Sequence, residues 1–149
     1  MRKMVFGKKL SRGRKSREAL LRSLLQQIVV NGKVTTTKAK TKAMQRDADR
    51  LVTLAKEGTL AAQRKVSAIL GNKRKITEIV FKKIAPVFSG KKGGYTRIIL
   101  LPGRKGDNAE MATIEWSEKV VYVEPKKEEK KEVKKETKKV TKIKKEEKK

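Results

Sequence analysis

The side chains best suited to chemistry in this chain are its cations, and the chemistry they suit is phosphate binding. Lysine and arginine number 42 against 16 aspartate and glutamate residues, which gives a formal net charge of +26. Guanidinium and ammonium groups hold phosphate oxygens through charge-assisted hydrogen bonds. So large an excess of one sign is typical of proteins that bind nucleic acids. We therefore expect a polyanionic partner.

Other kinds of chemistry find few suitable residues. Histidine and cysteine are absent, so the commonest nucleophile–base pairs, zinc sites and proton shuttles cannot be built. Asp107, Glu110 and Glu115 could in principle hold Mg²⁺, but their spacing matches no EF-hand, and the Gly-Asp-Asn context of Asp107 favours a turn bonded to its own backbone. We expect no enzyme activity, metal, cofactor or small-molecule substrate.

A glycine-containing basic turn separates two β-rich runs, at residues 95–101 and 111–116. Runs of this kind on either side of a turn predict an antiparallel hairpin, here with Arg104 and Lys105 at its tip. The preceding loop at 90–94 carries Lys91 and Lys92 but lacks the frame of a nucleotide-binding loop. Its glycines permit close approach to RNA or simply end a loop. Tyr95 could stack on a base or pack inside the fold.

The N-terminal segment is a basic arm. Residues 1–17 contain eight cations and no acid, and their few apolar residues follow no helical or strand period, so the segment cannot bury enough surface to order itself. It could be a solvated extension or a targeting sequence, but the uniform sign favours insertion between nucleic-acid strands.

Helical periodicity dominates residues 16–86. Ser16 is predicted to cap a first helix that Gly32 ends, and its apolar stripe comprises Leu20, Leu21, Leu24, Leu25, Ile28 and Val29. A short strand at 33–36 leads into a threonine cap at Thr36 or Thr37. The second helix runs to about residue 56, with Met44, Ala48, Leu51 and Ala55 on one face. The simplest interpretation of these apolar stripes is that they form the hydrophobic core.

Four cations crowd the first turns of this second helix: Lys38, Lys40, Lys42 and Arg46. They oppose the helix dipole, at a cost of a few tenths of a kcal/mol each, unless a phosphate lies there and uses both the cations and the free N–H groups. We interpret this arrangement as functional.

Two further helices follow, and glycine marks their boundaries. Gly58 precedes a helix through residue 70, Gly71 precedes another with apolar residues at 76, 79, 80 and 84, and Pro86 closes the helical half. Residues 120–123 could extend the last strand or begin the tail. Residues 126–149 hold 13 lysines and 6 glutamates without an aromatic residue, so we expect disorder there.

Five short motifs in order carry a family resemblance. They are TT at 35–36, KAK at 38–40, LVTLAK at 51–56, GGYTRI at 93–98 and GDNAEMA at 106–112. In this order they resemble the bacterial large-subunit ribosomal protein L17 family, over residues 1–116. The resemblance implies a two-layer body with a small sheet packed on helices. It also implies a structural role on large-subunit ribosomal RNA, near the polypeptide exit side and beside neighbouring ribosomal proteins.

Together these observations predict an α/β protein of the α+β type, with about four helices packed on a small sheet and a C-terminal hairpin. We expect a basic arm over residues 1–16, a globular domain over 17–123 and a disordered tail over 124–149. No stretch approaches the roughly 18 apolar residues of a membrane span, so a cytoplasmic protein without membrane contact is expected, located in the large ribosomal subunit.

The residues expected to face RNA are mostly cations. They are Arg2, Lys3, Lys8, Lys9, Arg12, Arg14, Lys15, Arg17, Lys38, Lys40, Lys42, Arg46, Lys91, Lys92, Tyr95, Arg97, Arg104 and Lys105. Two other classes fit part of the sequence. A DNA-compacting protein would use the same charge, whereas an RNA-processing enzyme would have to work without histidine or cysteine.

Overall fold

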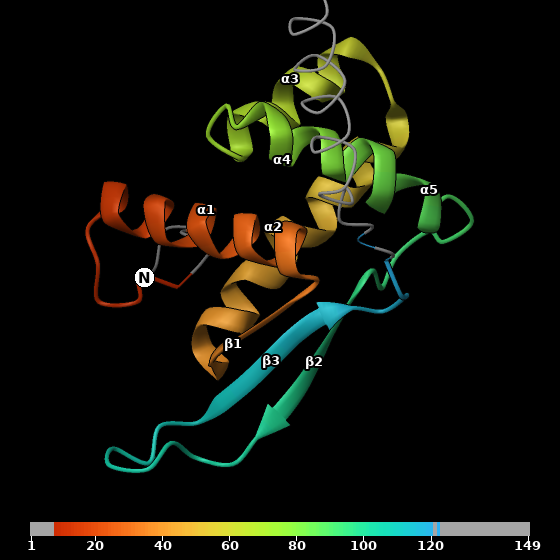
Figure 1. Ribbon diagram of the computed structural model, residues 1–149. Coiled ribbons are helices and arrows are strands. Elements are labelled where there is room, and N and C mark those ends of the chain that lie inside the picture. Colours follow the sequence, from red (N-terminus) through yellow and green to blue (C-terminus); the bar gives the residue numbers. More distant parts are fainter. Residues whose placement is uncertain (1–7, 121, 123–149) are drawn as a thin grey trace, which may run out of the picture.

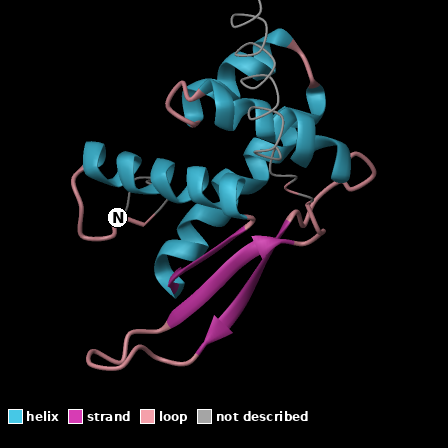
Figure 2. Ribbon diagram, viewed as in Figure 1, coloured by secondary structure: helices cyan, strands magenta, loops and turns pink. Residues whose placement is uncertain are grey.

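A computed structural model describes residues 8–120 and residue 122. Helices pack on one face of a small antiparallel sheet, and the hairpin of that sheet projects away from the helices (Figure 1). The colouring by secondary structure shows the helices grouped on one side of the molecule and the strands on the other (Figure 2). This arrangement confirms the predicted α+β fold.

The first helix, α1, spans Arg14–Asn31. Gly13 precedes it and forms no side-chain cap, so the predicted cap at Ser16 is wrong and Ser16 lies inside the helix. An ion pair from Arg14 Nε to Glu18 Oε1, 3.0 Å long, joins residues one turn apart and supports the earlier start. Gly32 ends the helix in the left-handed conformation, as predicted.

Strand β1, Lys33–Thr37, leads directly into helix α2, Lys38–Glu57. Thr37 takes the cap position in extended conformation, but its side chain makes no capping hydrogen bond. The predicted apolar face is confirmed as buried, and one further apolar residue, Val52, joins it: the buried set is Met44, Ala48, Leu51, Val52 and Ala55. Gly58 ends α2 in the left-handed conformation.

Helix α3, Leu60–Ile69, begins at a true cap, because the Thr59 hydroxyl accepts a hydrogen bond from the Ala62 N–H at 3.1 Å. After a turn, α4 (Arg74–Ile79) continues through a π-helical turn, η1 (Val80–Ile84), into α5 (Ala85–Val87).

Pro86 therefore lies inside the last helical turn, and the helical half ends one residue later at Val87, close to the predicted end. Proline lacks an N–H and cannot bond the carbonyl four residues before it. The wider π-helical turn immediately before it accommodates this loss: the Ala85 N–H bonds the Val80 carbonyl five residues back.

The predicted hairpin is present as β2, Thr96–Leu101, paired antiparallel with β3, Met111–Trp116. Strand β1 joins the opposite side of β3, which gives the strand order β1-β3-β2. Val34 lies opposite Ile114 and Ile98 also lies opposite Ile114, so three apolar side chains meet on the face toward the helices.

The core lies between that face and the helices. Phe88, Ile28, Met44 and Leu51 are among its largest fully buried side chains. Residues 121 and 123–149, which include the predicted disordered tail, lie outside the described residues, as do residues 1–7 of the arm.

Candidate nucleic-acid interface

The first turns of α1 and α2 carry cations and no acids. Neither helix has a side chain that caps its free N–H groups, so each N-terminus keeps its positive dipole end alongside positive side chains. The positive charge of Lys38 is partly neutralised, because its Nζ lies 3.0 Å from Glu110 Oε2. The charge arrangement expected from the sequence is therefore present at the start of α2, and the start of α1 shows the same arrangement.

A groove between the beginning of α1 and the first half of α2 brings together cations that are far apart in the sequence. Its lining residues are Lys8, Arg17, Leu21, Lys42, Ala43, Arg46, Asp47 and Arg50. Five of these are cations and one is a carboxylate. We call this the α1–α2 groove. Four of its cations belong to the predicted contact set, so the structure unites part of the arm with part of α2.

Arg50 is absent from the predicted set, although a sequence signal for it exists. Lys42, Arg46 and Arg50 follow one another at intervals of four residues, which places them on one face of a helix. The apolar stripe of α2, with Met44 and Leu51 fully buried, faces the opposite side. Extending the cationic series by one more turn would have found Arg50.

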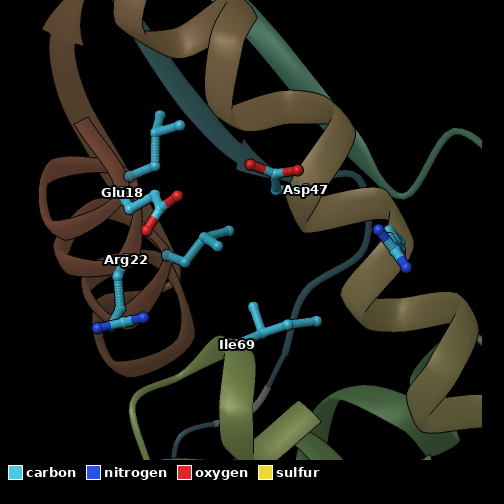
Figure 3. A pocket seen from close by; sticks show the side chains of 7 residues that line it. Glu18, Arg22, Asp47 and Ile69 are labelled. Carbon is cyan, nitrogen blue, oxygen red and sulfur yellow. The ribbon is translucent and has the colours of Figure 1, made fainter. Parts of the chain in front are cut away.

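Among the described residues, Asp47 is the only acid that lines the groove. Burial raises the pKa of its carboxyl above the usual range, and the neighbouring Arg46 and Arg50 guanidinium groups lower it in part. A second hollow adjoins this one and shares Leu21, Asp47 and Arg50 with it. Figure 3 shows Glu18 on α1, Asp47 on α2 and Ile69 on α3 around this second hollow.

The predicted cations of the hairpin form a separate group and are partly neutralised within the chain. Arg97 lies opposite Glu115 across the strands, and its Nε and Nη2 donate to Glu115 Oε1 at 3.0 and 2.6 Å. Arg104 binds Asp107 with two parallel contacts, 3.1 Å from Nε to Oδ1 and 2.5 Å from Nη2 to Oδ2. Lys105, which follows Arg104 in the turn, is exposed at the tip of the hairpin.

Asp107 has the role in a turn that the sequence favours over a metal site. Its Oδ1 accepts a hydrogen bond from the Ala109 N–H at 3.2 Å. The hydrogen bonds from Arg104, followed by that from Ala109, lower the pKa of Asp107 from 3.8 to about 2. Within the described residues no group of three or more acids is placed to hold a metal ion.

Tyr95 is the predicted contact that the structure places elsewhere. Its side chain is only 3% exposed, and its ring packs edge-on against Phe88 with 5.5 Å between centroids. The Tyr95 hydroxyl donates to the Lys91 carbonyl at 3.3 Å, and Lys56 Nζ lies 5.6 Å from the ring centroid. The ring therefore completes the core, which favours the packing interpretation of Tyr95 over base stacking, and its contact with RNA stays a prediction.

The remaining predicted cations are dispersed. Lys91 Nζ pairs with Glu118 Oε1 at 2.5 Å, and Lys92 is exposed beside it. Arg12 Nη1 donates to the Leu10 carbonyl at 2.9 Å, so the Arg12 side chain contacts the backbone of the arm itself. Exposed Lys9, Arg14 and Lys15 surround the start of α1, and half-buried Lys40 lies on α2. Arg2 and Lys3 lie outside the described residues.

No helix among residues 8–120 is long and apolar enough to cross a membrane.

Comparison with known proteins gives consistent matches. A family model described as Ribosomal protein L17 matches residues 20–117. The large ribosomal subunit protein bL17 of Acholeplasma laidlawii (strain PG-8A) is 44% identical over 118 residues, 76% of this chain and 99% of that protein.

The protein of the same name from Hydrogenobaculum sp. (strain Y04AAS1) is 44% identical over 119 residues, 79% of this chain and 100% of the relative. These matches confirm the resemblance carried by the five sequence motifs. Because the family model covers most of the folded body and the relatives align over their whole length, the chain belongs to the ribosomal protein L17 family.

Proposed function

We propose that this protein is a structural, non-catalytic constituent of the large ribosomal subunit in the cytoplasm and binds large-subunit ribosomal RNA. The relatives carry the name of a large-subunit protein. The α1–α2 groove is the observation that supports RNA binding, since it concentrates Lys8, Arg17, Lys42, Arg46 and Arg50 in a chain of net charge +26.

The groove suits an RNA backbone because its cations come from two elements at once. Phosphates between α1 and α2 would accept hydrogen bonds from guanidinium groups on both sides, which fixes their position without reading the bases. The start of each helix, which no side chain caps, adds a favourable dipole and backbone N–H donors, of which the Lys38 N–H is already bonded to the Glu110 carbonyl at 3.0 Å. Bound phosphate would also relieve the repulsion among the cations.

The hairpin is the proposed second contact. Its tip projects away from the helices (Figure 1), so the groove and the tip could hold two separate RNA segments. Arg104 is held by Asp107 in a fixed orientation and keeps its exposed side chain at the surface. Lys105 adds a further charge there. By family resemblance, we place these contacts near the polypeptide exit side, beside neighbouring ribosomal proteins.

Replacement of two groove cations tests this proposal. The double variant Arg46→Gln, Arg50→Gln should bind deproteinised large-subunit rRNA about 100-fold more weakly, if each lost phosphate contact contributes about 1.4 kcal/mol. The slope of log affinity against log salt concentration should become shallower by about 1.8, because two fewer counterions are released. Filter binding at several salt concentrations measures both quantities.

The matched control is Arg64→Gln, Lys65→Gln, which removes the same charge from exposed residues of α3 outside the groove. We expect this control to lose much less affinity. Equal losses in the two double variants would show that only the net charge matters, and the groove would then not be a site.

A further inference from the structure

Strand β2 forms one edge of the sheet, because it pairs with β3 on one side and with no other described strand on its opposite side. An unpaired edge offers a row of backbone N–H and C=O groups to any extended segment that can align with it. Native proteins usually protect such an edge with lysine, proline or a bulge. Strand β2 reads TRIILL, without lysine or proline.

The ladder shows which amides of β2 point toward the open edge. The Ser117 N–H bonds the Tyr95 carbonyl at 2.9 Å, and hydrogen-bonded pairs recur at every second residue of an antiparallel ladder. With the observed register, Arg97, Ile99 and Leu101 therefore face β3 through their backbone groups. The N–H groups of Ile98 and Leu100 are directed to the open edge.

The side chains along this edge are apolar and unusually exposed. Leu100 is 62% exposed, Ile99 41% and Leu101 40%. Ile99 and Leu101 lie on the face away from the helices and Leu100 on the opposite face, so exposed apolar side chains flank the open edge on both sides. Scattered exposed leucines would need no explanation, but here three are adjacent on one edge strand. Both features needed for strand addition, free backbone groups and apolar side chains, thus occur in the same segment.

Charge on this part of the sheet is nearly balanced. On the face away from the helices, Arg97 is paired with Glu115, and the Thr35 and Thr113 hydroxyls bond each other at 2.8 Å. Lys33 is the remaining charged residue of the three strands on that face. Phosphate contacts need cations, so this surface fits a polypeptide better than it fits RNA.

We propose that the open edge of β2 pairs with an extended segment of another protein of the large subunit. The segment would be apolar at alternate positions and free of net positive charge, since the chain itself carries +26. This inference rests on the proposed function, because assembly on a common RNA supplies the high effective concentration that a small interface needs.

A second copy of this chain is a poorer occupant. A six-residue strand is about 20 Å long, and pairing along it buries much less than the roughly 1,600 Å² of a stable interface. Two chains of charge +26 would also repel each other. A partner already held nearby avoids both obstacles.

The test uses intact large subunits that carry the full-length chain with a photocrosslinking phenylalanine analogue at Ile99. We expect a cross-link to another protein, while the same probe at exposed Leu60 on α3 serves as the position control. In wild-type subunits, the Ile98 and Leu100 amides should exchange hydrogen at least about 100-fold more slowly than in the free chain.

Two substitutions separate backbone pairing from side-chain contact. Leu100→Pro removes an N–H at the open edge and leaves the bonds to β3 intact, so it should reduce the cross-link at least about tenfold. Leu100→Thr keeps the N–H and should retain most of it. If the proline variant fails to enter subunits, amide exchange in the wild type decides.

Several outcomes would overturn the proposal: a cross-link to rRNA, a cross-link to a second copy, an equal cross-link in the proline variant, or unprotected amides in subunits that contain the protein. Sedimentation separates this failure from failure of the proposed function. A chain absent from large subunits contradicts both, whereas a chain present there with a free β2 edge contradicts the edge pairing alone.

Discussion

At the scale of single residues, cations of the same type differ in what they can offer a ligand. Arg97 and Arg104 each hold a carboxylate in two contacts. Arg46 and Arg50 line a groove whose single carboxylate, Asp47, has a pKa raised by burial. A phosphate at the hairpin must compete with Glu115 or Asp107, but a phosphate in the groove meets an excess of positive charge.

The Arg104–Asp107 contact makes a specific prediction about pH. The pKa of Asp107 is lowered to about 2, so the contribution of this contact to the turn is fully present above the ordinary value near 3.8 and is lost as the pH falls through about 2. In Arg104→Gln the pKa of Asp107 should rise toward its ordinary value. Carboxyl NMR titration of the full chain measures both midpoints.

Lys105→Gln is the control for this titration, because it removes a neighbouring charge without touching the two hydrogen bonds from Arg104. Its Asp107 midpoint should stay near 2. A midpoint that moves as far in Lys105→Gln as in Arg104→Gln would show that general charge, and not the paired contact, lowers the pKa of Asp107.

At the scale of elements, two left-handed glycines end α1 and α2 in different surroundings. Gly32 has φ of 77° and Gly58 has φ of 65°. A Cβ at Gly32 would lie 3.0 Å from Tyr122 Cε2, whereas a Cβ at Gly58 would meet nothing within 4 Å. The Tyr122 hydroxyl also lies 3.1 Å from Trp116 Nε1, which ties the end of α1 to the segment after β3.

We expect Gly58→Ala to lower the free energy of unfolding by about 1–2 kcal/mol, the cost of a left-handed L-residue. Gly32→Ala should cost more, because its methyl group must also displace the Tyr122 ring. Urea unfolding of the full-length variants gives both values.

The background variant Tyr122→Ala isolates the second effect. In that background the added cost of Gly32→Ala should fall to that of Gly58→Ala. If Gly32→Ala costs the same with and without the tyrosine ring, the contact with Tyr122 does not contribute to stability.

The elements themselves could largely be predicted because their signals are local. Gly32 and Gly58 end helices where the sequence indicates, and the hairpin follows from two β-rich runs around a turn. The pairing of Lys33 with Glu115 depends on contacts far apart in the sequence, and no local pattern specifies it. The burial of Tyr95 against Phe88 is likewise a tertiary property.

The candidate site was predictable in residue type but not in arrangement. Cations in the arm and at the start of α2 are evident from the sequence, yet the groove that joins Arg17 to Arg46 exists only after α1 packs against α2. Arg50 could have been found from helical spacing alone. The predicted hairpin cations remain a prediction as RNA contacts, and the ion pair of Arg97 makes it a weaker candidate than Arg46.

At the scale of the whole molecule, the described body has two surface regions of different character. The α1–α2 groove gathers cations, while the sheet face that turns away from the helices is nearly neutral, and the adjoining β2 edge is apolar. A ribosomal protein that contacts RNA on one side and a protein neighbour on another would need such a division.

Sedimentation of the tagged full-length protein from lysate, with and without a high-salt wash, tests the central claim most directly. If the protein is a constituent of the large subunit, it migrates in stoichiometric amount with that particle and stays there through the wash. Migration with DNA, or release into the free fraction at modest salt, would contradict the account and indicate a general polyanion binder.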